Sequence, residues 1–302
     1  MKPCQKKAFR YLLVLSQFLS PFIASAEEKR PNIVLFYADD LGYTDLSCQG
    51  SSYYKTPHID RIGKEGITFT NAYAAAANCA PSRASLLSGL YTPRHGVFTV
   101  NNSDRGKAKH RKLIPIKNTE VLAPKFTTLA ESLKSAGYQT CIAGKWHVSP
   151  DPTKDGFDTN FGGNKSGHPR SYFSPYKNPQ LKDGPKGEHL PERLGRDVSN
   201  WIADHKETPF FVYLPFYSVH TPIQARDDLA KKYSERPKTE PHHNPKYAAM
   251  IEAMDLAVGQ VLKTLEEQDL SDNTLVIFTS DNGPHGNISR ATPLRGVKGM
   301  YY

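Results

Sequence analysis

The chain has 302 residues, of which 39 are basic and 30 acidic, and 38% are hydrophobic, including 16 tyrosines and 14 phenylalanines. This composition excludes a disordered chain, and the length accommodates one large α/β domain or two smaller ones. Four basic residues lie within the first 26 positions, so the positive excess falls from nine to five without that segment. Such a mild excess is compatible with an anionic substrate, and we expect no nucleic-acid partner.

The first 26 residues have the pattern of a secretory signal peptide. Basic residues precede an apolar run over 11–24, which ends in Ala24-Ser25-Ala26, a small-x-small cleavage site. Polar residues and Pro21 interrupt the run, which is too short to span a bilayer as a helix. We therefore expect an exported protein, periplasmic or extracellular, with no membrane span and a mature chain of residues 27–302.

Export makes the cysteines informative, because disulfides persist in oxidising compartments. Cys4 lies in the predicted signal peptide, so the mature chain keeps Cys48, Cys79 and Cys141. Three cysteines do not make a disulfide framework. Cys48 and Cys141 are small buried residues or one optional pair, and both interpretations stay open.

Apolar runs alternate with helical periodicity along the mature chain. Short continuous apolar runs are typical of strands buried on both faces, and apolar residues three and four positions apart are typical of helices. In chain order we predict a strand over 32–38, a helix that starts at Cys79, a helix over 127–136, a strand over 138–143, a helix over 194–203, a strand over 210–214, a helix over 247–267 and a strand over 274–280. This alternation predicts an α/β fold with a mostly parallel central sheet and helices on both faces.

Two long segments lack such patterns. Residues 101–124 are polar and basic, and residues 161–191 are rich in Gly, Pro, Lys and His. Segments of this length within a compact domain are often functional. The basic stretch 107–112 is explained as well by a solvated loop as by a contact with a polyanionic chain.

Acidic and amide side chains follow the first and the last predicted strands. Asp39 and Asp40 end the first strand, and Asp281 and Asn282 end the last. If these strands are neighbours, the four side chains meet at the carboxyl edge of the sheet, where sites of parallel sheets form. A hard divalent cation would relieve the repulsion between the carboxylates, and all-oxygen ligation favours Ca²⁺ or Mg²⁺ over zinc. Either pair alone is more typical of turns and helix caps, but the two together favour a metal.

Cys79 lies at the predicted start of a helix. Pro81 falls in the first turn, where its missing N–H costs nothing, and Arg83 lies one turn after Cys79 on the same face. Backbone N–H groups and the helix dipole favour an anion at this end, so we expect a reactive thiol with a lowered pKa. A plain buried cysteine is the alternative.

Four further basic side chains follow predicted strands or lie near the end of the chain: Lys145, His147, His220 and Lys298. Each alone is typical of a surface lysine or a hydrogen-bonded core histidine. Together at one sheet edge they would surround a metal-bound tetrahedral anion with positive charge and provide two groups that move protons.

From about Pro31 to its last residue the chain resembles the sulfatase family, within the alkaline-phosphatase-like superfamily. The motif Cys79-x-Pro81-x-Arg83, followed by Leu-Leu-Ser-Gly over 86–89, is similar to the signature read by the formylglycine-generating maturation enzyme. Other similar segments, in family order, are 31–34 with 39–42, 144–147, 220–222, 280–283 and 294–299. A lone Cys-x-Pro-x-Arg is weak evidence, whereas six segments in order are specific.

The resemblance implies a calcium site and a modified nucleophile. Asp39, Asp40, Asp281 and Asn282 bind Ca²⁺, and the modified Cys79 reaches the metal as well. Formylglycine at position 79 is hydrated to a geminal diol, and one of its hydroxyls attacks sulfur.

It also implies roles for the basic residues. Arg83 supports the diol, and Lys145 and Lys298 neutralise the sulfate oxygens. His220 protonates the departing alcohol. His147 takes a proton from the second hydroxyl, so that the sulfated intermediate expels sulfate and restores the aldehyde.

The family resemblance implies an alkaline-phosphatase-like fold with a smaller C-terminal subdomain that contains an antiparallel sheet. The sequence stops at Tyr302, where family members generally continue. We therefore expect residues 27–302 to be an incomplete N-terminal catalytic domain, truncated before most of that subdomain. Leu90 also stands where many relatives carry Arg.

The activity implied is hydrolysis of a sulfate ester, and the context of His220 is similar to exported sulfatases that act on sulfated carbohydrates. Two alternatives stay open. One is an inactive truncated sulfatase that binds sulfated glycans, and the other is a phosphodiesterase or phosphonate hydrolase of the same superfamily.

Overall fold

The computed structural model describes residues 29–104, 106–239 and 242–300. The predicted signal peptide, residues 1–26, lies outside the described residues. All helices and strands below belong to the unit that begins at Pro31. Within the described ranges, no helix combines the length and the apolar character needed to cross a membrane.

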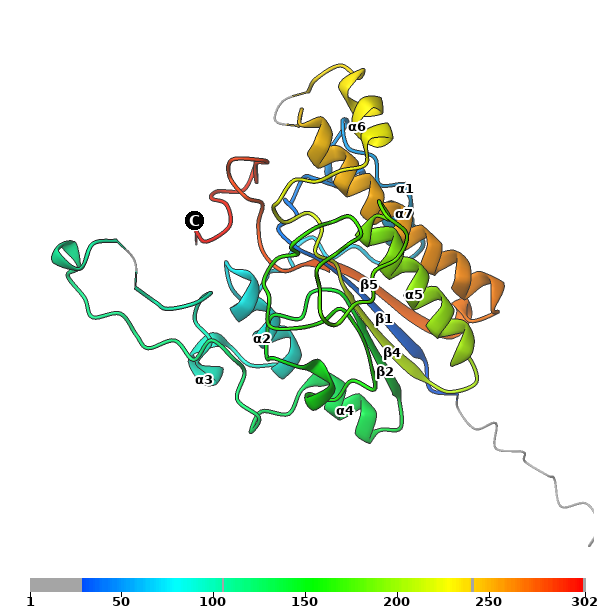
Figure 1. The fold of residues 1–302 in the computed structure, drawn as a ribbon, viewed down its shortest axis with the longest axis horizontal. Coiled ribbons are helices and arrows are strands. Elements are labelled where there is room, and N and C mark those ends of the chain that lie inside the picture. The colour runs from blue at the N-terminus through cyan, green and yellow to red at the C-terminus, as the bar shows by residue number, and fades with distance from the viewer. Residues whose placement is uncertain (1–28, 105, 240–241, 301–302) are drawn as a thin grey trace, which may run out of the picture. The chain divides into compact units, whose positions relative to one another are not determined.

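Among the described residues, five strands form one parallel sheet (Figure 1). The strands are β1 (Asn32–Ala38), β2 (Gln139–Ala143), β3 (Thr159–Phe161), β4 (Phe210–Pro215) and β5 (Thr274–Ser280). Their order across the sheet is β3-β2-β4-β1-β5. The prediction of a parallel α/β sheet is confirmed, and the four predicted strands are present; the short edge strand β3 was not predicted.

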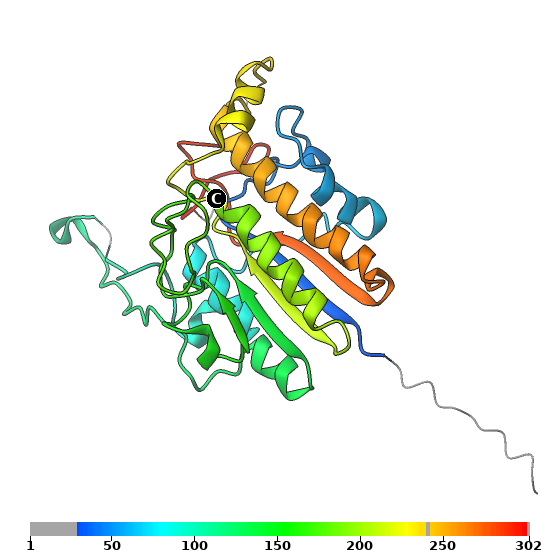
Figure 2. The same cartoon turned by 45° about the vertical axis from the view of Figure 1, so that its right-hand side comes forward.

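Helices cover both faces of this sheet (Figure 2). On one face lie α1 (Pro57–Glu65), α5 (Leu190–Asp204), α6 (Asp227–Ser234) and α7 (Pro245–Glu267), and on the other lie α2 (Cys79–Ser88), α3 (Thr92–His95) and α4 (Leu129–Ser135). Val34 and Phe36 of β1 point into the first core, whereas Leu35 and Tyr37 point into the second. The predicted helices are present, although α5 starts at Leu190 rather than 194, and α1, α3 and α6 were not predicted.

Local hydrogen bonds explain where two of the predicted helices begin. Before α4, the Glu131 N–H donates to the Thr128 hydroxyl at 3.1 Å, and the Thr128 N–H donates to the Glu131 carboxylate at 2.7 Å. Before α7, the Asn244 side chain accepts from the Tyr247 N–H at 3.1 Å, and Pro245 occupies the first turn. Each helix therefore starts where nearby side chains satisfy N–H groups that have no partner within the helix.

The prediction that residues 274–280 are buried on both faces is wrong. β5 lies at an edge of the sheet, and its side chains alternate between partly buried and exposed, with Leu275 53% and Ile277 37% exposed. The similar run in β1 is buried on both faces because β1 lies between β4 and β5. An apolar run alone does not reveal its place in the sheet, because that place depends on pairing between distant segments.

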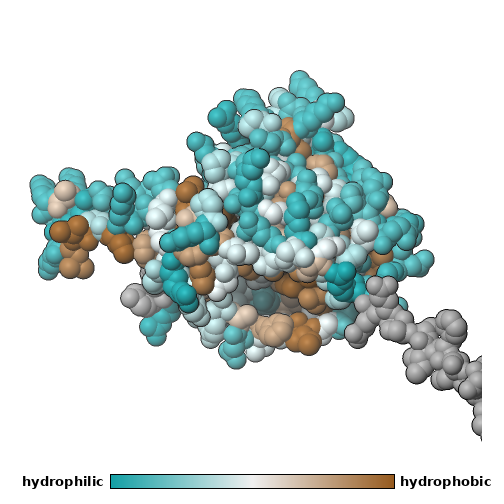
Figure 3. Space-filling view, turned by 90° about the horizontal axis from the view of Figure 1, so that it is seen from below, coloured by the Kyte–Doolittle hydropathy of each residue, from teal (hydrophilic) through white to brown (hydrophobic). Residues whose placement is uncertain are grey.

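The irregular segment 101–124 extends away from the sheet as an arm (Figure 1). Besides its basic residues it exposes Leu113, Ile114 and Ile116, and brown areas lie beside teal ones on this arm in Figure 3. Its predicted polar character therefore holds only in part. Contact of the arm with a polyanionic chain stays a prediction.

Candidate active site

The acidic side chains predicted at two strand ends lie together. β1 and β5 are paired in register up to their last residues, so the residues that follow them are neighbours. The Asp40 N–H donates to Asp281 Oδ1 at 3.2 Å, and Asn282 Nδ2 donates to Asp40 Oδ1 at 2.7 Å. Asp39 and Asp281 are fully buried. The expected convergence at the carboxyl edge of the sheet is present.

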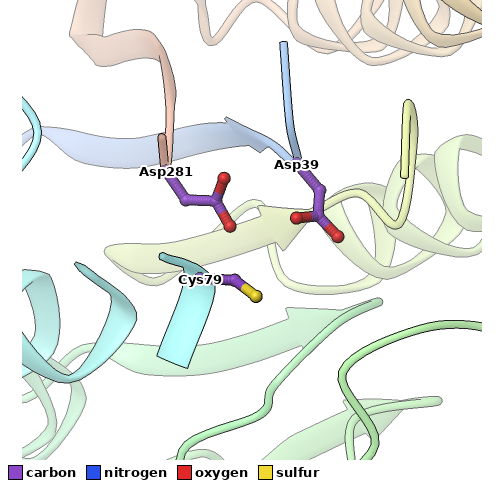
Figure 4. Close-up of side chains that lie close together, drawn as sticks. All are labelled: Asp39, Cys79 and Asp281. Carbon is purple, nitrogen blue, oxygen red and sulfur yellow. The ribbon is translucent and has the colours of Figure 1, made fainter. Parts of the chain in front are cut away.

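Cys79 faces this acidic group from the first residue of α2. The side chains of Asp39, Cys79 and Asp281 point towards one another in Figure 4, and one ligand atom from each lies within 4.8 Å of the others. Burial raises the pKa of the Cys79 thiol, against the lowering effect of Lys145. The prediction of a lowered pKa is therefore wrong, because lost solvent and the two carboxylates disfavour the thiolate.

Arg83 lies one turn into α2 and is fully buried. Its Nη2 and Nε donate to Asp281 Oδ2 at 2.9 and 3.2 Å, and its Nη1 donates to the Lys145 carbonyl oxygen at 2.9 Å. Burial would raise the pKa of Asp281, but Arg83 and Lys145 hold it below its usual range. The guanidinium also lies 5.1 Å from the centre of the Tyr37 ring. Arg83 therefore joins α2 to the carboxyl end of the sheet.

Lys145 reaches the site from the turn after β2. Its buried Nζ donates to Asp39 Oδ2 at 2.5 Å, and its N–H donates to the Pro215 carbonyl oxygen at 2.7 Å. The preceding Gly144 has φ +117°, and a Cβ there would lie 2.1 Å from the Pro215 carbonyl oxygen. Only glycine combines this backbone conformation with so close an approach to the neighbouring strand.

Replacing Gly144 by alanine is expected to lower the free energy of unfolding by ~3 kcal/mol or more, because backbone strain and a collision with backbone add. Gly50 is a matched control, since its φ is +115° and a Cβ there would meet nothing within 4 Å. Gly50→Ala is expected to cost about 1 kcal/mol, from strain alone. Urea unfolding of both variants measures the difference, and equal losses would contradict the collision.

Lys298 approaches from the last described segment. Its Nζ lies 2.8 and 2.9 Å from the two carboxylate oxygens of Asp40. Burial would lower the pKa of Lys298, but Cys79 and Asp40 raise it above its usual range. The Gly299 N–H donates to the Ala77 carbonyl oxygen at 2.8 Å, which holds this segment beside the start of α2.

The two predicted histidines lie at the same edge. His220 Nδ1 contacts the Thr221 carbonyl oxygen at 2.7 Å and must donate there, because a carbonyl only accepts. Its Nε2 lies 3.7 Å from Asp40 Oδ2. Burial, aided by Lys145, lowers the pKa of His220 to about 4 and that of His147 to about 2, so the protonated form of either ring is a stronger acid than a free imidazolium.

Asp40 and His147 have φ of +60° and +59°, in the left-handed region that non-glycine residues rarely adopt. Such strained residues cluster at functional sites, where the surrounding structure holds them. The backbone of both residues is held by hydrogen bonds: Asp40 donates to Asp281, and the His147 N–H donates to the Asn164 carbonyl oxygen at 3.0 Å.

A pocket of about 530 Å³ opens beside Lys298 and His220. Its other lining residues include Asn78, Thr221, His285 and Asn287. Thr221 lies in the family-like segment 220–222, whereas Asn78, His285 and Asn287 belong to no recognised motif, since isolated amide and imidazole side chains in loops carry no pattern. Their groups can exchange hydrogen bonds with hydroxyl groups of a ligand.

Asp45 is a further buried residue at the site, and no sequence motif marks it. Its carboxylate accepts from the Gly42 N–H at 2.8 Å and from the hydroxyls of Tyr247 and Ser289, both at 2.7 Å. Tyr247 Oη also lies 3.3 Å from the Asp40 carbonyl oxygen. Asp45 therefore ties the turn after β1 to α7 and to the segment that leads to Lys298.

Comparison with known proteins agrees with this arrangement. A family model described as Sulfatase matches residues 31–301. A sulfatase of Formosa agariphila is 33% identical, with 99% of this chain and 66% of the relative covered, and human N-acetylgalactosamine-6-sulfatase is 32% identical, with 86% and 51% covered. The crystal structure of Ps i-CgsB in complex with k-i-k-neocarrahexaose has a TM-score of 0.74 at 29% identity, with 90% of this chain and 63% of that chain covered.

The chain thus spans between 51% and 66% of the length of these two curated relatives. The family model nevertheless covers the whole sheet and every site residue described above. The match runs from β1, which leads to Asp39, to the segment that carries Lys298. This chain belongs to the sulfatase family.

Proposed function

We propose that this protein hydrolyses a sulfate ester on a carbohydrate, with a formylglycine derived from Cys79 and a calcium ion at the carboxyl edge of the sheet. One observation carries the proposal: the buried side chains of Asp39, Cys79 and Asp281 lie close together. Three cationic side chains surround them, those of Arg83, Lys145 and Lys298. Relatives named N-acetylgalactosamine-6-sulfatase and a neighbour solved with k-i-k-neocarrahexaose support a carbohydrate substrate.

The donor set of the site fits calcium. Among the residues that the structure describes, Asp39 Oδ1 and Asn282 Oδ1 are buried acceptors without a hydrogen bond. Buried polar atoms of this kind call for a partner, and carboxylate and amide oxygens are the ligands that Ca²⁺ prefers. Asp39, Asp40, Asp281 and Asn282 would hold the ion. When bound, calcium offsets the carboxylate charge and polarises a sulfate oxygen.

Cys79 is proposed to be a precursor that a formylglycine-generating maturation enzyme oxidises. The aldehyde hydrate supplies the attacking hydroxyl. Residue 79 is the first residue of the buried helix α2. Burial excludes bulk water from it, and the N-terminal end of the helix favours the negative charge of the sulfate. Arg83, held on Asp281, orients the group at position 79 from one turn away.

Lys145 and Lys298 bind the sulfate oxygens. In this structure Lys145 contacts Asp39 and Lys298 contacts Asp40. Both ammonium groups therefore already lie beside the carboxylates that would hold the calcium ion. Positive groups fixed in a buried site stabilise the charge that grows on the oxygens in the transition state without a large rearrangement.

The two histidines move protons. Nδ1 of His220 is engaged by the Thr221 carbonyl oxygen, which leaves Nε2 for the departing alcohol. His147 is buried and neutral, which suits a base that takes a proton from the hydrate at position 79.

The test is turnover by protein made together with a formylglycine-generating enzyme. We expect sulfate release from a 6-O-sulfated N-acetylgalactosamine and from 4-nitrophenyl sulfate. An aryl phosphate diester is expected to react at least ~100-fold more slowly, because it offers only two non-bridging oxygens to the metal and the two lysines, whereas a sulfate monoester offers three. Faster turnover of the diester would favour a phosphodiesterase, and binding of sulfated glycans without any turnover would favour an inactive binder.

Removal of calcium is expected to abolish turnover and to destabilise the protein. A ligand present at 100 times its Kd contributes about 2.7 kcal/mol to stability by mass action. Dialysis against EGTA should therefore lower both kcat and the melting temperature, and added Ca²⁺ should restore both. Added Mg²⁺ is the control and should restore less, because it requires tighter octahedral geometry. Full activity in metal-free protein, verified by elemental analysis, would rule out the calcium site.

Export is the remaining part of the proposal. The basic and apolar pattern of residues 1–26 and the cleavage site after Ala26 support it. N-terminal sequencing of the protein from its host should begin at Glu27, in a periplasmic or extracellular fraction.

A further inference from the structure

The irregular segment between β3 and α5 contacts both histidines of the site. Residues 162–172, here called the histidine-facing segment, belong to the stretch 161–191 whose composition the sequence analysis noted. Hydrogen bonds hold the start of this segment: Asn164 Nδ2 donates to Asn178 Oδ1 at 3.0 Å, and the Ser166 N–H donates to Asn164 Oδ1 at 2.8 Å. The segment is therefore anchored before it reaches the site.

On the side of His147, the segment meets both backbone and ring. The His147 N–H donates to the Asn164 carbonyl oxygen at 3.0 Å. A Cβ built on Gly167 would lie 2.5 Å from His147 Cε1 and 2.8 Å from Nε2. Residue 167 thus packs directly against the imidazole, and any side chain there would displace it.

On the side of His220, the next residue provides an aromatic contact. The rings of His168 and His220 are stacked, with centroids 6.3 Å apart and planes inclined by 18°. Tyr172 Oη lies 2.9 Å from the His220 carbonyl oxygen and donates to it or to the Tyr217 carbonyl oxygen at 2.5 Å. One segment therefore supports the backbone and the ring of His220 together.

We propose that the histidine-facing segment sets the orientation of both histidines, and that His168 is a positioning residue that aligns His220 with the leaving oxygen. This inference rests on the proposed sulfate-ester hydrolysis. As the sulfur–oxygen bond breaks, its electron pair goes to the departing oxygen. The doubly protonated form of His220 transfers its Nε2 proton to that oxygen and keeps the Nδ1 proton that it donates to the Thr221 carbonyl oxygen. A tilted His220 ring would slow this transfer while leaving attack on sulfur intact.

The leaving group provides the readout. A 4-nitrophenolate ion departs readily without a proton, whereas a 4-methoxyphenolate or a sugar alkoxide depends on one. His168→Ala is expected to lower kcat/KM about tenfold or more for 4-methoxyphenyl sulfate, and less than about twofold for 4-nitrophenyl sulfate. His168→Phe keeps a ring at this position and is expected to recover most of the loss. Lys182→Ala, an exposed change in the same stretch, is the control.

An equal loss for both esters, or no loss for either, would overturn the role of His168. A wild-type protein that hydrolyses no sulfate ester would instead refute the proposed function. A measurement that needs no turnover separates the two cases. In the histidine NMR spectrum, His168→Ala should shift the Cε1 proton resonance of His220 because the neighbouring ring current is lost, and His168→Phe should restore part of the shift. An unchanged resonance would overturn the stacking contact itself.

Discussion

Replacing Cys79 by alanine is expected to lower kcat/KM for sulfate esters by about 10⁴-fold or more, because the proposed nucleophile is formed from this side chain alone. Cys79 is buried, and alanine is close to it in size, so the free energy of unfolding should change little. The measurement is sulfate release by protein made with the maturation enzyme, together with urea unfolding.

Cys48 is the control. It is free and exposed, so the interpretation of Cys48 as a buried or paired residue is wrong, whereas Cys141 is free and buried. Cys48→Ala should retain full activity. The mass of the peptide that contains Cys79 should match conversion of the CH₂–SH group to an aldehyde in active wild-type protein. Full activity with an unmodified thiol at position 79 would refute the formylglycine proposal.

Replacing Arg83 by methionine is expected to lower the free energy of unfolding by about 3–5 kcal/mol, because it leaves the carboxylate of Asp281 buried without its cation. Arg83 and Asp281 are both fully buried and lie 2.9 Å apart. Activity should fall as well, since Arg83 also orients the start of α2 through the Lys145 carbonyl oxygen. Arg83→Lys should recover only part of the stability, because lysine cannot reproduce the two contacts with Asp281 Oδ2.

Two further variants test whether the loss of stability comes from the unpaired carboxylate of Asp281. Arg196 pairs with Glu188 at the surface with its side chain 44% exposed, and Arg196→Met should cost no more than about 1 kcal/mol. Combining Arg83→Met with Asp281→Asn removes the charge that the single change leaves unpaired. The double variant should therefore regain stability relative to Arg83→Met in urea unfolding, while activity stays lost. A single variant as stable as wild type would contradict the proposed cost of the unpaired carboxylate.

Asp45 and the histidine-facing segment hold the backbone of the site in place, although neither is expected to bind the sulfate. Asp45 fixes the turn that carries Asp40, and Asn164 holds the backbone of His147, whose φ is positive. Strained residues persist only where surrounding hydrogen bonds hold them. Changes at these supporting positions should therefore alter activity without touching the sulfate itself.

Much of the fold follows from local patterns. The apolar runs of β1, β2, β4 and β5 predict strands because strands of a parallel sheet, covered by helices, are typically short continuous apolar runs. The capping residues Thr128 and Asn244 and the periodicity of α7 locate helices through contacts within a few residues. These signals depend on neighbours in sequence, so they are readable before the fold is known.

The place of each strand in the sheet follows different physics. The order β3-β2-β4-β1-β5 is set by pairing between segments far apart in the chain, and it makes β5 an edge strand with Leu275 exposed. The pKa of Cys79 is a similar case: the sequence indicates a helix start that favours a thiolate, but burial beside Asp39 and Asp281 raises the pKa. Desolvation depends on the whole surrounding structure, which no local pattern contains.

For the candidate site, the sequence by itself determined which polar residues follow the predicted strands and begin the predicted helix. The carboxyl ends of parallel strands lie at one edge of the sheet, so these residues were expected to lie close together. Only the tertiary structure links Asp45 to the Asp40 backbone through the Tyr247 hydroxyl and stacks His168 with His220. Asp45 and Ser289 are separated by 244 positions, and their hydrogen bond exists only after the chain has folded. Residues that act by contact across such distances leave no periodic or spacing signal, because their contacts form only in the folded chain.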